Sequence, residues 1–245
     1  MTGDAHPDPG VFATTRWTLV TRARGGTPEA RSALSDLCAA YYAPVAAFLR
    51  RETRDPDAAR ELTHEFFARL LAGSGVAGAD PARGRFRSYL LGAVKHFLQV
   101  DRVRRSAAKR GAGAEHVPLE PGTDTSPGLD LPDPGAVPAD AAFEREWAHA
   151  LLGRALDRLG AAMAAEGKAH HFGTLKPCLL GSDPAVPYVE LAVRLGLTEA
   201  AVKVAVHRLR KRFRDAVHAE IADTLADPGQ VDEELQHLVA VLSGA

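Results

Sequence analysis

Several side chains in this sequence have the types that catalysis or metal binding needs, but they do not form complete sets. Glu61 and His64 have the Glu-x-x-His spacing of half a di-iron site, and we interpret them as polar side chains that face solvent and bind no metal. His170, His171 and Cys178 are zinc-ligand types without a fourth partner or C-x-x-C spacing. The sequence has neither a G-x-S-x-G elbow nor a P-loop. We therefore predict no metal, no cofactor and no enzymatic activity.

The larger concentration of chemically active side chains is cationic. The net charge of −1 is unevenly distributed, because residues 1–110 carry 18 Lys and Arg against 11 Asp and Glu. Residues 111–142 carry six acids and no Lys or Arg, whereas Lys203 to Arg214 hold six basic residues and no acid. Cationic segments separated in this way favour contact with nucleic acid at two places.

The second cationic segment follows a helix-turn-helix pattern. Pro187 suits the first turn of a helix, Gly196 stands where the turn needs a positive φ, and Thr198 can cap the next helix. Ala192 precedes Gly196 by four residues and Val202 follows it by six, which is the spacing that this motif requires. The other residues that we expect to be buried here are Val189, Leu191, Leu195 and, in the angle between the helices, Leu197.

The second helix of this motif has an apolar stripe beside a cationic face. The stripe recurs at spacings of 4, 3 and 4, at Val202, Val206, Leu209 and Phe213. Basic side chains flank it, so early residues of the helix could reach base edges while later arginines hold phosphates. Considered alone, the run of basic residues would also fit an amphipathic helix whose basic face is exposed to solvent and binds no DNA. The residues that we expect at the DNA are Thr198, Glu199, Ala200, Lys203, Val204, His207, Arg208, Arg210 and Lys211.

The elements that position these residues are all helical, so we predict an all-α fold of two small helical domains. Residues 111–140 contain six prolines and no periodicity, which predicts a flexible, acidic, Pro-rich linker. We divide the chain into an N-terminal extension (1–29), a first domain (30–110), the linker (111–140), a second domain (141–216) and a C-terminal helical extension (217–245). The predicted helices begin near Asp57, Phe86, Asp140, Leu175 and Pro187.

The order of these segments resembles the extracytoplasmic-function sigma factors, the small two-domain branch of the sigma-70 family of bacterial RNA polymerase sigma factors. The stretch DPDAARELTHEFFARLL is similar to the family's core-binding signature. FRSYLLGAVKHFLQVDRVRRSAAKR resembles its melting and −10 segment, and LTEAAVKVAVHRLRKRF its −35-reading helix-turn-helix. The chain departs from the family pattern at His64, His96, Val204 and Ala205, and Asp101 falls one residue late.

The resemblance implies a cytoplasmic protein that binds core RNA polymerase and directs promoter-specific initiation. It would recognise −10 and −35 elements through sigma domains 2 and 4 and assist strand opening. Its implied partners are the β′ clamp and β flap of the polymerase and promoter DNA, with an anti-sigma factor or another regulator as a further partner. The implied contacts with the polymerase are Arg60, Glu61, His64 and Glu65. Those with the −10 element and the DNA backbone are Tyr89, Lys95, His96, Arg102, Arg104, Arg105 and Lys109.

Several alternatives stay open from the residues themselves. The chain could be a helix-turn-helix transcriptional regulator whose first half is a sensor or dimerisation domain. Phe86, Tyr89 and Phe97 could stack on unpaired bases or lie in the core, and core burial is favoured for each. The acidic linker could imitate nucleic acid or act as an ordinary spacer.

The C-terminal extension contains a further predicted helix that begins at Asp227-Pro228. Its apolar stripe recurs at 4, 3 and 4, and Asp232, Glu233 and Glu234 suit the positive end of the helix dipole. We expect it to pack back against the second domain, with a regulatory or partner-binding helix as the alternative. The stripe consists of Val231, Leu235, Leu238 and Leu242.

Composition also bears on the compartment. The first ten residues are acidic and polar, which is unlike a signal peptide, and no apolar run has the length of a membrane span. Two cysteines, Cys38 and Cys178, are too few for a disulfide framework, which fits a reducing compartment. We therefore expect no contact with a membrane.

Overall fold

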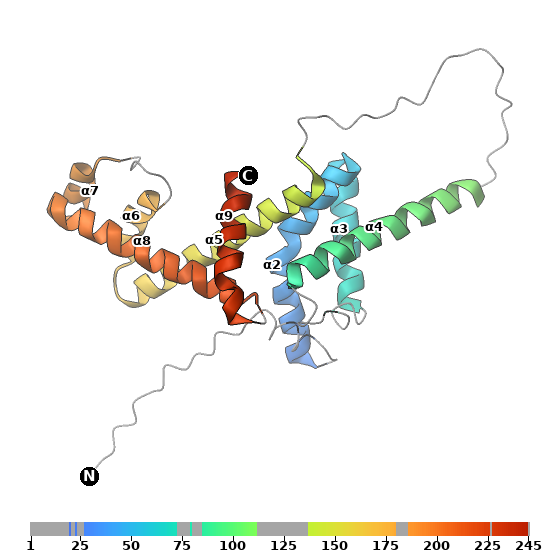
Figure 1. Cartoon of the computed structure of the whole chain (residues 1–245), viewed down its shortest axis with the longest axis horizontal. Helices are drawn as coiled ribbons and strands as arrows, with labels where there is room; N and C mark the ends of the chain where they lie inside the picture. Colours follow the sequence, from blue (N-terminus) through green and yellow to red (C-terminus); the bar gives the residue numbers. More distant parts are fainter. Residues whose placement is uncertain are drawn as a thin grey trace, which may run out of the picture.

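The described part of the protein is helical throughout, which confirms the predicted all-α class. The computed structural model describes residues 20, 23, 27–72, 79, 85–111, 137–179, 186–225 and 227–244, and the side chains of 108–111 and of Pro228 lie outside this description. Within these ranges every regular element is an α-helix or a short 3-10 helix (Figure 1). Most of the predicted N-terminal extension and the interior of the predicted linker, 112–136, fall outside the described residues.

The side chains just before two helices near the N-terminus accept hydrogen bonds from the first-turn amides of those helices. Helix α2 (Pro28–Thr53) begins after Thr27, whose hydroxyl accepts a hydrogen bond from the Ala30 amide at 3.2 Å. It ends at Arg54, which adopts a left-handed conformation with φ of 57°. Helix α3 (Pro56–Ala72) follows at once, and the Asp55 carboxylate accepts from the Asp57 amide at 2.9 Å. The short connection makes α2 and α3 antiparallel neighbours, as Figure 1 shows.

Helix α4 (Phe86–Gly111) completes the helical body of the first half. Its apolar N-terminal part packs on α2 and α3 through aromatic rings. Tyr41 meets Phe86 edge-on at 5.3 Å between centroids, and Phe66 meets Phe97 at 5.6 Å. Phe86 and Phe97 are both buried, so neither is available to stack on an unpaired base.

Helix α5 (Ala139–Ala165) connects the two halves of the molecule. It packs against α2 in the first half and against α8 (Glu199–Ala222) in the second (Figure 1). Phe143, Trp147 and Leu151 are almost completely buried along this contact. The buried apolar side chains of both halves form one connected cluster, so the halves share a core in this structure. The predicted separation into two domains with a flexible linker stays a prediction.

Helix α5 also differs slightly from its prediction at its start. The helix begins at Ala139 after Pro138, whose fixed φ of −53° leads the chain into it, one residue before the predicted start at Asp140. Asp140 lies inside the first turn instead, where a carboxylate still complements the helix dipole.

The remaining helices build the second half around α5. Helix α6 (Ala169–Leu175) and the 3-10 turn η2 (Lys176–Cys178) replace the single short helix predicted near Leu175–Leu180. Helices α7 (Tyr188–Leu195) and α8 follow as the helix-turn-helix. The 3-10 turn η3 (Pro228–Gln230) leads into α9 (Val231–Ser243).

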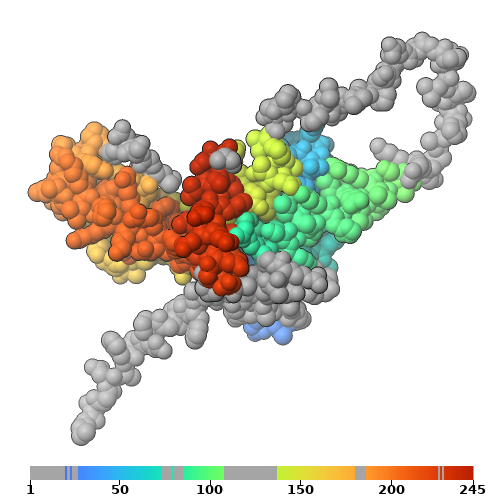
Figure 2. Space-filling view, viewed as in Figure 1, coloured from blue at the N-terminus to red at the C-terminus, as the bar shows by residue number. Residues whose placement is uncertain are grey.

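Helix α9 packs back onto the second half and also reaches the first. It contacts α5 and α8, which confirms the expectation that the extension packs back. In Figure 2 it lies between α8 on one side and α4 on the other. Glu234 and Leu238 are its buried residues, whereas Leu242, predicted to lie in the apolar stripe, is 40% exposed.

Helix α2 alone is long and apolar enough, by length and composition, to cross a membrane among the residues searched. Half of its most apolar stretch is buried against the rest of the protein, as in the core helix of a globular fold.

Candidate nucleic-acid interface

The turn between α7 and α8 has the geometry that its sequence predicts. Gly196 adopts a left-handed conformation with φ of 64° and ψ of 32°, and the Leu197 amide donates to the Ala192 carbonyl at 2.9 Å. Thr198 then caps α8, because its hydroxyl accepts from the Ala201 amide at 3.2 Å. Pro187 is the residue before α7, and the helix begins at Tyr188. These contacts fix the angle at which α8 leaves the turn.

The predicted apolar stripe of α8 is confirmed, but the burial pattern of α7 differs from its prediction. Val202, Val206, Leu209 and Phe213 are all buried. In α7 the buried residues are Leu191 and Ala192, whereas Val189 is 60% exposed and Leu197 is 37% exposed. Val189 precedes Leu191 by two residues, which places it on nearly the opposite side of so short a helix.

The outer face of α8 presents most of the residues predicted to contact DNA. Arg210 is the exception, because it is half-buried and its Nε donates to the Cys178 carbonyl at 3.0 Å, which joins α8 to η2. Lys203 forms an ion pair with Glu199 at 2.8 Å, and this hydrogen bond raises the pKa of Lys203. The exposed members of the predicted set are Thr198, Glu199, Ala200, Lys203, Val204, His207, Arg208 and Lys211.

A second cationic face lies on the C-terminal half of α4. Arg102 contacts Glu52 on α2 at 2.8 Å. The buried carboxylate of Asp101 holds Arg104 at 2.9 Å and Arg105 at 2.6 Å. All three arginines are more than half exposed, so their ion pairs are weak and a phosphate could replace an acid as partner. Sequence reasoning did not identify Asp101 as the residue that orients this face.

The N-terminal half of α4 holds the other residues predicted to contact the −10 element. Tyr89 is half-buried and stacks on Phe86, with 6.0 Å between ring centroids. Lys95 is exposed and pairs with Asp140 of α5 at 2.5 Å, and His96 is exposed. The side chain of Lys109 lies outside the described residues.

The polar face of α3 is where the sequence predicts contact with the polymerase. Arg60, Glu61 and His64 are exposed, and Glu65 is half-buried because it accepts from Arg69 at 2.6 Å and from Arg104 at 3.3 Å. The hydroxyl of Tyr42 on α2 lies 2.9 Å from His64 Nε2. Leu62 and Phe66 on the same helix are buried, as expected. The face is therefore polar, accessible and held in place by neighbouring helices.

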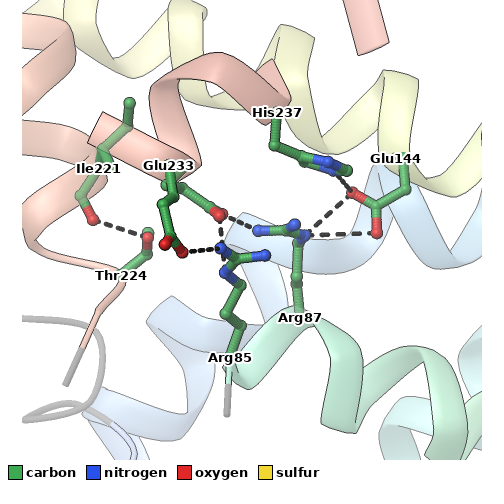
Figure 3. Close-up of polar contacts among 8 residues, drawn as sticks. Arg85, Arg87, Glu144, Ile221, Thr224, Glu233 and His237 are labelled. Atoms are coloured by element: carbon green, nitrogen blue, oxygen red, sulfur yellow. Dashed lines mark hydrogen bonds and ion pairs between the residues drawn. The ribbon is translucent and has the colours of Figure 1, made fainter. Parts of the chain in front are cut away.

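An ionic cluster that sequence reasoning missed joins α4, α5 and α9. Arg87 is 4% exposed, lies 4.3 Å above the Trp147 ring and reaches Glu144 of α5 at 3.0 Å (Figure 3). Arg87 also contacts Glu234 of α9, and Arg85 Nε lies 2.8 Å from the same carboxylate. Burial lowers the pKa of the Arg87 guanidinium, and the Glu144 carboxylate opposes that shift. The sequence signal for this cluster is the acidic start of α9, which the helix dipole alone would also explain.

The described residues include further side chains of the types that bind metal ions. The Glu-x-x-His spacing of Glu61 recurs at Glu146 and at Glu234. Nevertheless, the described part of the chain brings together no group of three or more His, Cys, Asp or Glu that could hold a metal ion.

Known proteins give no independent identification. No protein-family model, curated protein or solved structure matches this chain.

Proposed function

We propose that this protein is a sigma factor that binds core RNA polymerase and directs promoter-specific transcription initiation. In this proposal α7 and α8 form the −35-reading unit and α4 contacts the −10 element and assists strand opening. The polar face of α3, with Arg60, Glu61, His64 and Glu65, docks on the polymerase. The protein then supplies recognition and no catalytic group.

The observation that carries the proposal is the positioned helix-turn-helix. Because Gly196 and Thr198 fix the turn, the N-terminal end of α8 projects from the body with its side chains exposed. Such a helix fits the major groove, where its first residues meet base edges. Arg208 and Lys211, farther along the exposed face, are suited to phosphates, which set the register of the helix on the duplex.

A second DNA-facing element distinguishes a sigma factor from a simple helix-turn-helix protein. Arg102, Arg104 and Arg105 form an exposed cationic face on α4, far along the chain from α8. Two cationic helices on one molecule are suited to contact DNA at two separated elements. Neighbouring α3 offers an accessible polar face for a protein partner, so one side of this half could hold polymerase while α4 holds DNA.

Reconstitution tests the proposal directly. Core RNA polymerase with the purified protein should give run-off transcripts from a subset of genomic fragments, and core polymerase alone should not. Replacing Arg208 and Lys211 by alanine should abolish promoter selection. The slope of log affinity for duplex DNA against log salt concentration should also fall in magnitude by about 1 for each lost phosphate contact. Arg145→Ala, which removes an exposed cation from α5, is the matched control and should leave transcription unchanged.

The result that contradicts the proposal is equally specific. A protein that neither associates stoichiometrically with core polymerase nor yields promoter-specific transcripts is not a sigma factor. Tight binding to a specific operator without polymerase would instead favour the helix-turn-helix regulator.

A further inference from the structure

Carboxylates of the second half cover cations of α4. Asp140 of α5 pairs with Lys95 at 2.5 Å, and Glu144 of α5 pairs with Arg87 at 3.0 Å. Glu234 of α9 completes the series by contacting Arg87 again. Figure 3 shows Arg87 and Arg85 projecting from the start of α4 toward α5 and α9. The helix to which the proposed function assigns promoter DNA is thus partly covered by acids of its own chain.

Glu234 is the most enclosed of these acids. Its side chain is 1% exposed, and its two carboxylate oxygens face Arg87 and Arg85. The neighbouring Glu233 lies 3.8 Å from Arg85 but is 76% exposed, so it adds little. His237, one turn farther along α9, approaches Glu144 at 3.1 Å. A single α9 carboxylate therefore occupies the space between two arginines.

Such a contact suits a helix that can detach. Removing charges from water offsets much of the attraction between them, so a buried ion pair holds an interface less firmly than apolar packing of the same size. Leu238 is the one apolar residue of α9 that is fully buried, and Val239 on its outer face is 56% exposed. Val231, Leu235 and Val241 pack on the core but stay partly exposed, and a helix with one fully buried apolar side chain opens at a lower free-energy cost than the core helices.

We propose that α9 is an intramolecular latch, and that Arg85 and Arg87 form a binding site for a DNA backbone phosphate that Glu234 occupies while α9 is docked. The inference rests on the proposed function, which assigns α4 to promoter DNA. A carboxylate and a phosphate present similar oxygen pairs to a guanidinium, so either can fill the site. DNA is favoured over an acidic protein because the same helix continues with the exposed cations Arg102 and Arg105, along which a phosphate backbone can run.

The latch is tested by Glu234→Gln in the full-length protein, with Asp232→Asn as control. Both substitutions remove one charge from the first turn of α9, but Asp232 is exposed. Glu234→Gln should speed hydrogen exchange of the amides of residues 231–243 and increase affinity for a duplex of arbitrary sequence roughly tenfold, as expected if the docked form leaves about one molecule in ten competent. Its salt slope should rise by about 1 for each phosphate newly held. Asp232→Asn should match the wild type, and Arg85→Gln added to Glu234→Gln should cancel the gain.

A measurement on the unmodified protein avoids any effect of substitution on folding. Titrating the wild-type protein with the duplex at low salt should progressively speed exchange in α9 while leaving exchange in α8 slow. Duplex binding that leaves α9 fully protected would overturn the latch. The latch would also be overturned if Glu234→Gln folds and exchanges faster in α9 but does not bind the duplex more tightly. The two arginines would then bind an acidic protein surface or only stabilise the packing of α9.

These outcomes are separable from the fate of the proposed function. Normal run-off transcription together with unchanged duplex affinity of Glu234→Gln would refute the latch and leave the sigma factor standing. The opposite result is that the wild-type protein gives no promoter-specific transcripts with core polymerase, while Glu234→Gln still binds the duplex more tightly. It would refute the sigma factor and leave a latched DNA-binding protein.

Discussion

At the scale of single residues, Glu166 shows how the second half uses charge for structure. It accepts from Arg212 of α8 at 2.6 Å and from Lys168 at 2.9 Å, just after α5 ends. These hydrogen bonds, first that from Arg212, lower the pKa of Glu166 to about 2. Arg212 thus ties the end of α5 to α8, which explains why it is only partly accessible although it lies in the basic run.

The depressed pKa predicts how stability depends on pH. The Glu166 contribution is fully present above the pKa of an unfolded glutamate and is lost as pH falls through the folded value near 2. We expect the urea midpoint of the wild type to exceed that of Glu166→Gln near neutral pH, with the gap closing between about pH 4.5 and 2. A constant gap at every pH would contradict the assignment.

At the scale of elements, the conformation of the helix-turn-helix depends on one backbone position. Gly196 has φ of 64°, in the left-handed region that residues with a Cβ adopt only with strain. Nothing lies within 4 Å of a Cβ placed there, so a substitution acts through the backbone alone. A substitution at Gly196 therefore tests the effect of backbone conformation without introducing new side-chain contacts.

Gly196→Ala should destabilise the protein by about 1–2 kcal/mol and weaken duplex binding by misdirecting α8. Gly92→Ala is the matched control, because Gly92 lies within α4 with open space around its Cβ. That substitution should stabilise the protein by about 0.5–1 kcal/mol. Urea unfolding and duplex titration measure both effects. Equal responses of the two variants would show that positive φ at Gly196 is not required.

At the scale of the whole molecule, the shared core makes the two halves dependent on each other. Trp147 is 1% exposed on α5 and lies beneath Arg87 of α4, while its ring is 6.1 Å from the His237 ring of α9. One side chain thus contacts helices from both halves of the chain. Removing it should affect every helix around it.

Trp147→Ala should cost about 3–5 kcal/mol of unfolding free energy, as large-to-small changes in a core do. Hydrogen exchange should accelerate together in α3 and α8, because the halves unfold as one unit when they share a core. Val193→Ala, at a side chain that is 79% exposed, should change stability by less than about 0.5 kcal/mol. Exchange that accelerates in α8 while α3 stays protected would indicate two independently stable domains.

Much of this architecture follows from local sequence. The apolar stripe of α8, the left-handed turn at Gly196 and the cap at Thr198 are each set by neighbours a few residues apart, so spacing alone predicted them. The spacing rules failed where an element is short or ends. Val189 on two-turn α7 is an example, because there so few residues face the core.

The tertiary structure alone decided which charges are available. The cations of α4 and α8 look alike in the sequence, yet Arg208 and Lys211 are exposed, Arg210 holds a carbonyl and Arg87 is buried with Glu144. The residues predicted to bind DNA lie on helices that the sequence predicted, but the partners of their side chains could not be foreseen. The pairs of Arg87 with Glu144 and of Arg102 with Glu52 join side chains that are far apart in the chain, and such pairings have no local signature. The sequence by itself therefore determined the helices and their faces. The packing of α5 and α9 against α4, and of α8 against η2, determined which cationic side chains remain exposed to solvent.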